Sequence, residues 1–154
     1  FEAIQNNFSL LNRRFLDEMT VMCRQEKISL LPYSPMAGGV LSGKYNEDIA
    51  AAGRFTRYSA SPEERVRKIA QRFLNEKSLA STEKYINIAA ELGIRPATLA
   101  IAWSKQFDFV ASTIIGANSC AQLKDSVAAI DLVLSDETLA LCDRVHDEIL
   151  YPMG

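Results

Sequence analysis

Apolar residues recur along the chain with two different spacings. Short apolar runs at 1–11 and 28–34 are typical of strands. Between them the apolar positions recur at i, i+4, i+7 and i+8, which predicts one face of a helix: Phe15, Met19, Met22 and Cys23. A strand, a helix and a strand in this order indicate two parallel strands joined by a right-handed crossover.

A third strand is expected at 110–115, which is rich in β-branched residues and ends at Gly116. The connection before it begins at residue 36 and is too long for a plain turn. Within it Ser61 is placed as a helix N-cap and Pro62 at the first helical position, so a helix is predicted from about Pro62 to Leu74.

The pattern predicts four more helices. One carries Tyr85 to Leu92 and stops at Gly93, and the next begins at Pro96 and runs to Gln106. The last two have apolar stripes, at Cys120, Leu123, Val127 and Ile130, and, after the cap Ser135, at Leu139, Cys142, His146 and Ile149. Strands alternating with helices indicate an α/β barrel or an open doubly wound sheet. Since three parallel strands alone would leave one long edge unpaired, we interpret them as part of a larger sheet.

Composition narrows the class of protein. The chain has 154 residues, 48% of them hydrophobic and 23% charged, as expected of one globular domain. A net charge of -2 argues against a nucleic-acid partner, and no apolar run is long enough for a membrane span. The three cysteines lack CxxC spacing, which favours reduced thiols in the cytoplasm over disulfides or a zinc site. Because the first residue is Phe1, we expect that part of the protein lies upstream.

The first candidate site is the segment from Tyr33 to Gly39, at the carboxyl end of the second strand. Ligands of α/β folds bind at this end of the strands. Its glycines allow the backbone to approach a ligand, Tyr33 has a flat aromatic face, and positive charge follows at Lys44, Arg54 and Arg57. An anionic, aromatic ligand fits these features. A turn followed by a solvated basic loop is the alternative, and the segment contains neither GxGxxG nor a P-loop.

The second candidate is the turn and helix start from Ile115 to Gln122, whose backbone N–H groups can bind an anion. Gln122, Asp125 and Ser126 follow on one side of the helix. The residues from Ser119 to Gln122 are equally a capping box, which needs no ligand and is the favoured interpretation on the residues alone. His146 and the cysteines are interpreted as packing residues.

Four runs of sequence then identify a resemblance: IQNNFSLLNRRF, LLPYSPMAGGVLSGKY, RFTRYS and ASTIIGANSCAQLKDSVAAIDLVLSDE. In order and spacing they resemble the C-terminal part of the aldo-keto reductase family, in the branch of Tas-like bacterial reductases and potassium-channel β-subunits. The resemblance covers essentially the whole chain, residues 1–154. It implies the C-terminal part of a (β/α)8 TIM barrel, with about three parallel strands and flanking helices.

The resemblance also implies NADPH-dependent reduction of aldehydes and ketones by hydride transfer. By this resemblance, Gln5 binds the nicotinamide carboxamide, Tyr33 stacks on the nicotinamide ring, and Lys44 and Arg54 contact phosphate and adenosine. The pyrophosphate segment corresponds to Ser34, Pro35, Met36, Ala37 and Gly38. The clamp on the adenosine 2′-phosphate and adenine corresponds to Gly116, Asn118, Gln122, Asp125 and Ser126. Asn118, Asp125 and Ser126 depart from the residues common there, which bears on the preference for NADPH over NADH.

The family's catalytic residues belong to earlier strands, so no residue of this chain receives a catalytic role. We therefore expect the chain to act with the remainder of the barrel or with a second copy, on a small carbonyl substrate, and to be inactive alone. An alternative implied by the same resemblance is a non-catalytic subunit that binds a nucleotide or a partner.

Overall fold

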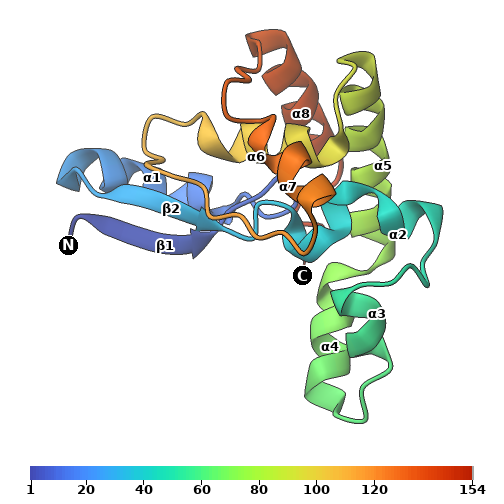
Figure 1. Ribbon diagram of the computed structural model, residues 1–154. Coiled ribbons are helices and arrows are strands. Elements are labelled where there is room, and N and C mark those ends of the chain that lie inside the picture. The colour runs from blue at the N-terminus through green and yellow to red at the C-terminus, as the bar shows by residue number, and fades with distance from the viewer. Residues whose placement is uncertain (154) are drawn as a thin grey trace.

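Two parallel strands form the sheet of the computed structural model, which describes residues 1–153. Strands β1 (Ala3–Asn7) and β2 (Ser29–Tyr33) pair in register from Ala3 opposite Ser29 to Asn7 opposite Tyr33. Helix α1 (Arg14–Glu26) connects them, and both arrows point the same way in Figure 1. The predicted strand, helix and strand are therefore confirmed, although the first strand ends at Asn7 rather than at residue 11.

The third expected strand, 110–115, is reduced to a single parallel bridge between Leu30 and Val110. Leu30 N–H donates to Phe109 O at 2.7 Å, and Ala111 N–H donates to Leu30 O at 3.0 Å. The next N–H to meet this edge of β2 is that of Ile114, which donates to Pro32 O at 2.8 Å. Pro32 has no N–H to continue the ladder. The third segment thus stays extended beside β2 without regular pairing.

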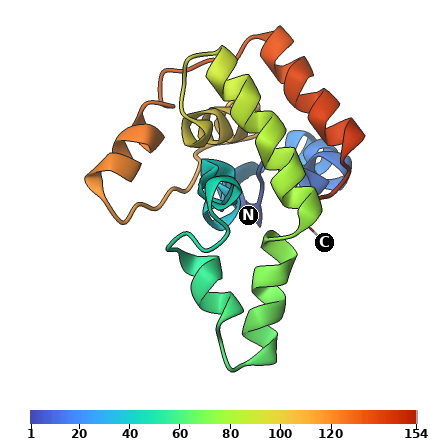
Figure 2. The ribbon, with the colours of Figure 1, turned by 90° about the vertical axis from the view of Figure 1, so that its right-hand side faces the viewer.

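Helices make up most of the remaining chain. Besides α1 they are η1 (Ala37–Ser42, a short 3₁₀ segment), α2 (Lys44–Glu47), α3 (Arg54–Ser59), α4 (Glu64–Phe73), α5 (Glu76–Glu91), α6 (Pro96–Lys105), α7 (Cys120–Val127) and α8 (Asp136–Glu148). The helices expected at 85–92, 96–106, 120–130 and after Ser135 are all present. Helices α3 and α4 project away from the rest of the molecule (Figures 1 and 2).

Helix α4 begins at Glu64, two residues later than the Ser61 cap predicts. The Ser61 hydroxyl accepts a hydrogen bond from Glu63 N–H at 3.2 Å, which forms a tight turn before the helix. The Arg67 guanidinium reaches back from the helix and donates to Ser61 O at 2.8 Å and to Pro62 O at 2.7 Å. These bonds satisfy the carbonyls of the turn, so the helix starts only after it.

Aromatic rings form the centre of the core between the sheet and α6. Phe8 is fully buried, and its ring centroid lies 4.8 Å from that of Trp103 on α6 and 5.2 Å from that of Phe107. Phe109 and Phe15 of α1 complete the cluster, with centroids 5.8 Å apart. Burying several large rings together is the main contribution to the stability of this layer.

Arg13 connects the loop after β1 to α8 through a buried guanidinium that lies 4.5 Å above the Trp103 ring. Its Nη1 donates to Asp143 Oδ1 at 2.6 Å and its Nη2 donates to Cys142 O at 2.8 Å. The Tyr85 hydroxyl on α5 donates to Leu10 O of the same loop at 3.2 Å. Helices α5 and α8 therefore both hold the segment in which β1 ends.

Helix α7 presents its apolar stripe to solvent instead of the core. Leu123 and Val127 are each 46% exposed and Ile130 is 61% exposed, while α7 packs mainly against α6. Figure 2 shows α7 well separated from α8. The interpretation of Cys120 as a packed hydrophobe is also wrong, since Cys120 is exposed, whereas Cys23 and Cys142 are buried; all three thiols are free.

Within residues 1–153, no helix is long and apolar enough to cross a membrane, and no three candidate ligand side chains gather to hold a metal ion.

His146, near the end of α8, makes the fold sensitive to acid. Burial and the nearby Arg13 guanidinium lower the pKa of His146 below its usual 6.5, against the smaller opposing effect of the carboxylates of Asp147, Asp17 and Asp143. The folded state therefore disfavours the protonated ring, and the unfolded chain binds more protons as the pH falls below the usual pKa. Stability from this residue is present at neutral pH and is lost as the pH falls.

We expect the His146→Gln variant to lose less stability than the unsubstituted chain between about pH 7.5 and about pH 5.5. Urea unfolding followed by circular dichroism at both pH values measures the difference. Equal losses of unfolding free energy in the two proteins would contradict this role for His146.

Candidate functional site

The carboxyl ends of β1 and β2 meet at one edge of the sheet because the strands are parallel. Gln5 pairs with Leu31, and Asn7 pairs with Tyr33, so Gln5 and Tyr33 belong to the same face of the sheet. Tyr33 is 43% exposed at the last position of β2, and Gln5 is exposed as well. The sheet therefore brings an exposed amide and an exposed aromatic ring to one surface.

Residues 34–39, called the glycine turn below, leave the end of β2 with an unusual backbone. Ser34, Ala37, Gly38 and Gly39 all have positive φ, with values of 58°, 49°, 65° and 101°. For Ser34 and Ala37 this conformation costs on the order of 1–3 kcal/mol each. Ser34 holds the turn together: its backbone O accepts from Ala37 N–H at 2.8 Å and its Oγ accepts from Gly38 N–H at 3.1 Å. Strained backbone of this kind is typical of functional sites.

Gly38 also leaves room for the helix that follows. A Cβ on Gly38 would lie 2.5 Å from Cζ of Phe55, a buried residue of α3. The Phe55 ring stacks in turn on Phe73 of α4, with centroids 4.6 Å apart. The glycine turn, α3 and α4 are thus packed as successive layers.

Two cationic side chains, Lys44 and Arg54, lie next to the glycine turn and α3. The ammonium of Lys44, at the start of α2, donates to Ala52 O at 3.1 Å and lies 4.8 Å above the Tyr45 ring. Its Cε is 3.7 Å from the position of a Cβ on Gly39. Arg54 is exposed at the first position of α3, directly before Phe55. Lys44 therefore lies beside the glycine turn, and Arg54 lies one residue before Phe55, whose ring packs on that turn.

The start of α7 forms the second part of the predicted site. Ser119 Oγ accepts from Gln122 N–H at 3.3 Å, and Gln122 Oε1 accepts from Asn118 N–H at 2.8 Å. These are capping contacts, with the return bond made to the residue before the N-cap. Capping therefore occupies Gln122 in part, although its side chain stays exposed.

The remaining α7 residues differ in their exposure. Asp125 is about one-third exposed, with Oδ2 3.7 Å from Arg95 Nε, and Ser126 is buried with its hydroxyl donating to Gln122 O at 3.0 Å. Gly116 has open space where a Cβ would stand. Helix α6 packs against both η1 and α7, so the two parts of the site flank this helix.

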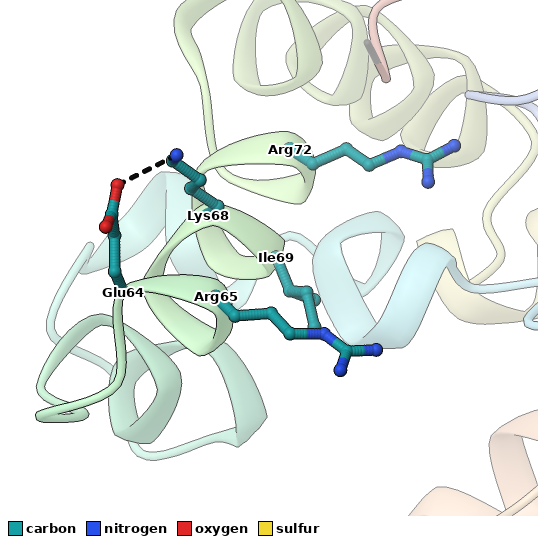
Figure 3. A pocket seen from close by; sticks show the side chains of 5 residues that line it. All are labelled: Glu64, Arg65, Lys68, Ile69 and Arg72. Carbon is teal, nitrogen blue, oxygen red and sulfur yellow. Dashed lines mark ion pairs between the residues drawn. The ribbon is translucent and has the colours of Figure 1, made fainter.

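Two hollows lie outside the glycine turn. One of about 370 Å³ is lined by Gln5 together with Phe1, Ala3, Ile4, Met22 and Ile28. The other, of about 510 Å³, runs along α4. Figure 3 shows that Lys68 meets Glu64, at 2.8 Å, whereas Arg65 and Arg72 extend on the other side with Ile69 between them. Glu64, Arg65 and Lys68 are all exposed, so this face of α4 lies in solvent.

Comparison with known proteins points to one family. The model of the Aldo/keto reductase family matches residues 1–147. Protein tas of Escherichia coli (strain K12) is 35% identical over 157 residues, covering 97% of this chain and 41% of its own length. A probable voltage-gated potassium channel subunit beta of Arabidopsis thaliana is 36% identical over 107 residues, covering 69% of this chain and 31% of its own length.

A third relative and a solved structure are also similar to this chain. L-glyceraldehyde 3-phosphate reductase of Escherichia coli (strain K12) is 29% identical over 143 residues, covering 91% of this chain and 40% of its own length. The structure of a glycerol dehydrogenase from Gluconobacter oxydans matches with a TM-score of 0.76 at 20% identity, over 97% of this chain and 43% of that protein. The fold is therefore that of part of a (β/α)8 barrel, and the chain spans between 31% and 43% of the length of these four proteins.

Gly38 should tolerate a side chain less well than another glycine with nearly the same positive φ. Gly38→Ala adds the overlap with Phe55 to the strain of a positive φ, so we expect the unfolding free energy to fall by about 2–4 kcal/mol. Gly93→Ala is the matched control, because Gly93 has φ of 67° and open space around it. Its loss should be about 1 kcal/mol. Chemical denaturation of both variants measures the difference, and equal losses would show that Phe55 yields freely.

Proposed function

The chain belongs to the aldo/keto reductase family, and from this premise we propose that it supplies the cofactor-binding part of an NADPH-dependent reductase of aldehydes and ketones. The observation that carries the proposal is the glycine turn, whose strained backbone stands at the carboxyl end of β2 between exposed Tyr33 and Lys44. An aromatic ring that can stack on a base, followed by a tight backbone turn and a cation that can bind phosphate, fits a dinucleotide. Residues 1–154 are proposed as the C-terminal portion of the barrel domain.

At the nicotinamide end we assign Gln5 and Tyr33. Both belong to one face of the sheet, and the exposed Tyr33 ring offers a surface for stacking. The Gln5 amide can donate and accept, as binding of a carboxamide requires. Together they would hold the reactive ring at the carboxyl ends of the strands, where barrel enzymes carry out their chemistry.

At the pyrophosphate we assign the glycine turn, through Ser34, Pro35, Met36, Ala37 and Gly38, with Lys44 beside it. The ammonium of Lys44 is already held by Ala52 O and the Tyr45 ring, so little side-chain freedom is lost when an anion binds. At the adenosine end we assign Arg54 and the start of α7, through Gly116, Asn118, Gln122, Asp125 and Ser126. The N-terminus of α7 favours a phosphate through its unpaired N–H groups and its dipole.

NADPH, when bound, supplies the hydride. The residues of this chain bind and orient the cofactor, and none of them is assigned as the proton donor to the carbonyl oxygen. We propose that the donor comes from the remainder of the barrel or from a second copy of the chain, which would also cover the free edge of β1 and the apolar stripe of α7. We propose a cytoplasmic location for this assembly because its three thiols are free.

A non-catalytic subunit of the same fold is the second candidate function. The observation that favours it is the 36% identity to a protein described as a probable potassium channel subunit beta. Such a subunit would bind the nucleotide with the same residues but would not turn over. Reductase activity of the complete assembly distinguishes the two candidates.

NADPH should bind to the chain more tightly than NADH, because Arg54 and the start of α7 can meet an additional phosphate. Arg54→Ala should narrow the difference in affinity by about tenfold, whereas Arg65→Ala, which removes the same charge from exposed α4, should leave it unchanged. Fluorescence titration with both cofactors measures the affinities. Equal affinities in the unsubstituted chain would remove the basis for assigning these residues to the 2′-phosphate.

The purified chain alone should show no measurable reductase turnover. Without a positioned proton donor the rate falls by a factor on the order of 10²–10⁴, and substrate positioning is lost as well. Oxidation of NADPH in the presence of a small aldehyde, followed by absorbance, tests this. Robust turnover by the 154-residue chain would place a proton donor among its own residues.

A further inference from the structure

Tyr45 is buried directly beneath the proposed phosphate site. It follows Lys44 in α2, is 2% exposed, and packs its ring beside that of Phe55, with centroids 6.2 Å apart. It therefore belongs to the helix that carries Lys44 and contacts the helix that carries Arg54.

The ring of Tyr45 supports Lys44. The Lys44 ammonium lies 4.8 Å from the ring centroid and donates to Ala52 O at 3.1 Å. An ammonium above an aromatic face is attracted by the ring's electron density. The cation is thus held from two sides before any anion arrives.

The hydroxyl of Tyr45 fixes the start of α3. Its oxygen accepts a hydrogen bond from Phe55 N–H at 3.3 Å. Phe55 is the second residue of α3, where a backbone N–H has no carbonyl of its own helix to meet. Gly53, at the N-cap position, has no side chain to accept this bond. Tyr45 performs the capping from outside the helix and so determines where Arg54 lies.

The space at Gly53 shows how closely these parts fit. A Cβ on Gly53 would overlap both Tyr45 Oη and Lys44 Nζ. The backbone there is extended, with φ of 179°, a conformation open to any residue. The requirement for glycine therefore comes only from the tyrosine hydroxyl and the lysine ammonium that occupy this space.

From these contacts we infer that Tyr45 is a positioning residue, which holds the Lys44 ammonium with its ring and the Arg54 backbone with its hydroxyl at a set separation. This inference rests on the proposed function, in which the two cations bind the phosphates of NADPH. Its consequence is that the preference for NADPH over NADH depends on a residue that touches neither cofactor.

The test uses Tyr45→Phe, which keeps the ring beneath Lys44 and removes only the acceptor for Phe55 N–H. We expect the ratio of NADH to NADPH dissociation constants to fall by about fivefold, as loss of one hydrogen bond that positions a charged contact would produce. Tyr58→Phe is the matched control, because Tyr58 lies on α3 and its ring also packs against Phe55, at 6.1 Å. The ratio should not change in this variant. An unchanged ratio in Tyr45→Phe, or an equal fall in Tyr58→Phe, would overturn the inference.

Gly53→Ala tests the same arrangement from the other side. The added methyl group must displace the Tyr45 hydroxyl and the Lys44 ammonium, so the ratio should again fall although the hydroxyl is retained. Thermal unfolding of each variant shows whether it is folded under the binding conditions. If Tyr45→Phe fails to fold, the ratio in Gly53→Ala decides alone, and an unchanged ratio overturns the inference.

Hydrogen exchange of the Phe55 amide separates this inference from the proposed function. In the unsubstituted chain this amide should exchange slowly, and in Tyr45→Phe at least about fivefold faster. If the unsubstituted chain binds neither dinucleotide, the proposed function fails, while faster exchange still supports the positioning of α3 by Tyr45. Equal exchange in the two proteins overturns that positioning whatever the affinities are.

Discussion

The close approach of Gly38 to Phe55 is the constraint on which the functional half of the molecule depends. Since no side chain stands at Gly38, the Phe55 ring fits against the backbone of the glycine turn, and α4 then stacks on Phe55 through Phe73. The same approach brings the start of α3 next to α2, where the Tyr45 hydroxyl meets Phe55 N–H. A turn of six residues thereby fixes the places of the two helices that project from the barrel layer.

Local rules in the sequence predicted most of the helices, because their signals act over a few residues. Ser135 caps α8 by accepting from Thr138 N–H at 3.3 Å, and α6 starts at Pro96, as each residue type predicts. The site at the end of β2 was also predictable, because the carboxyl ends of parallel strands lie at one edge of the sheet, where ligands of α/β folds bind. Resemblance to the family added roles for individual residues, such as Gln5, that spacing alone does not indicate.

The remaining features depend on partners distant in the sequence. The third strand fails where Pro32, a residue of its neighbour, lacks an N–H, and α4 starts late because Arg67 completes the preceding turn. Neither composition nor hydrophobic pattern distinguishes Tyr45 from the other buried aromatic residues. Only the space shared with Gly53 and the bond from Phe55 distinguish it, and no local signal encodes either. The apolar stripe of α7 predicted burial against the core, and this prediction is wrong, since Leu123, Val127 and Ile130 are exposed within residues 1–153.

Helix α7 has a further property that follows from its sparse packing. With α6 as its main support and Leu123, Val127 and Ile130 in water, little apolar contact is lost when this helix opens locally. Its opening free energy should therefore lie well below that of the core around Phe8. A ligand that binds Gln122 would have to order α7, and the entropy lost in this ordering would offset part of the binding free energy. A partner that covered the apolar stripe would order α7 before the ligand binds. The affinity at the adenosine end of the site would then rise without any new contact to the ligand.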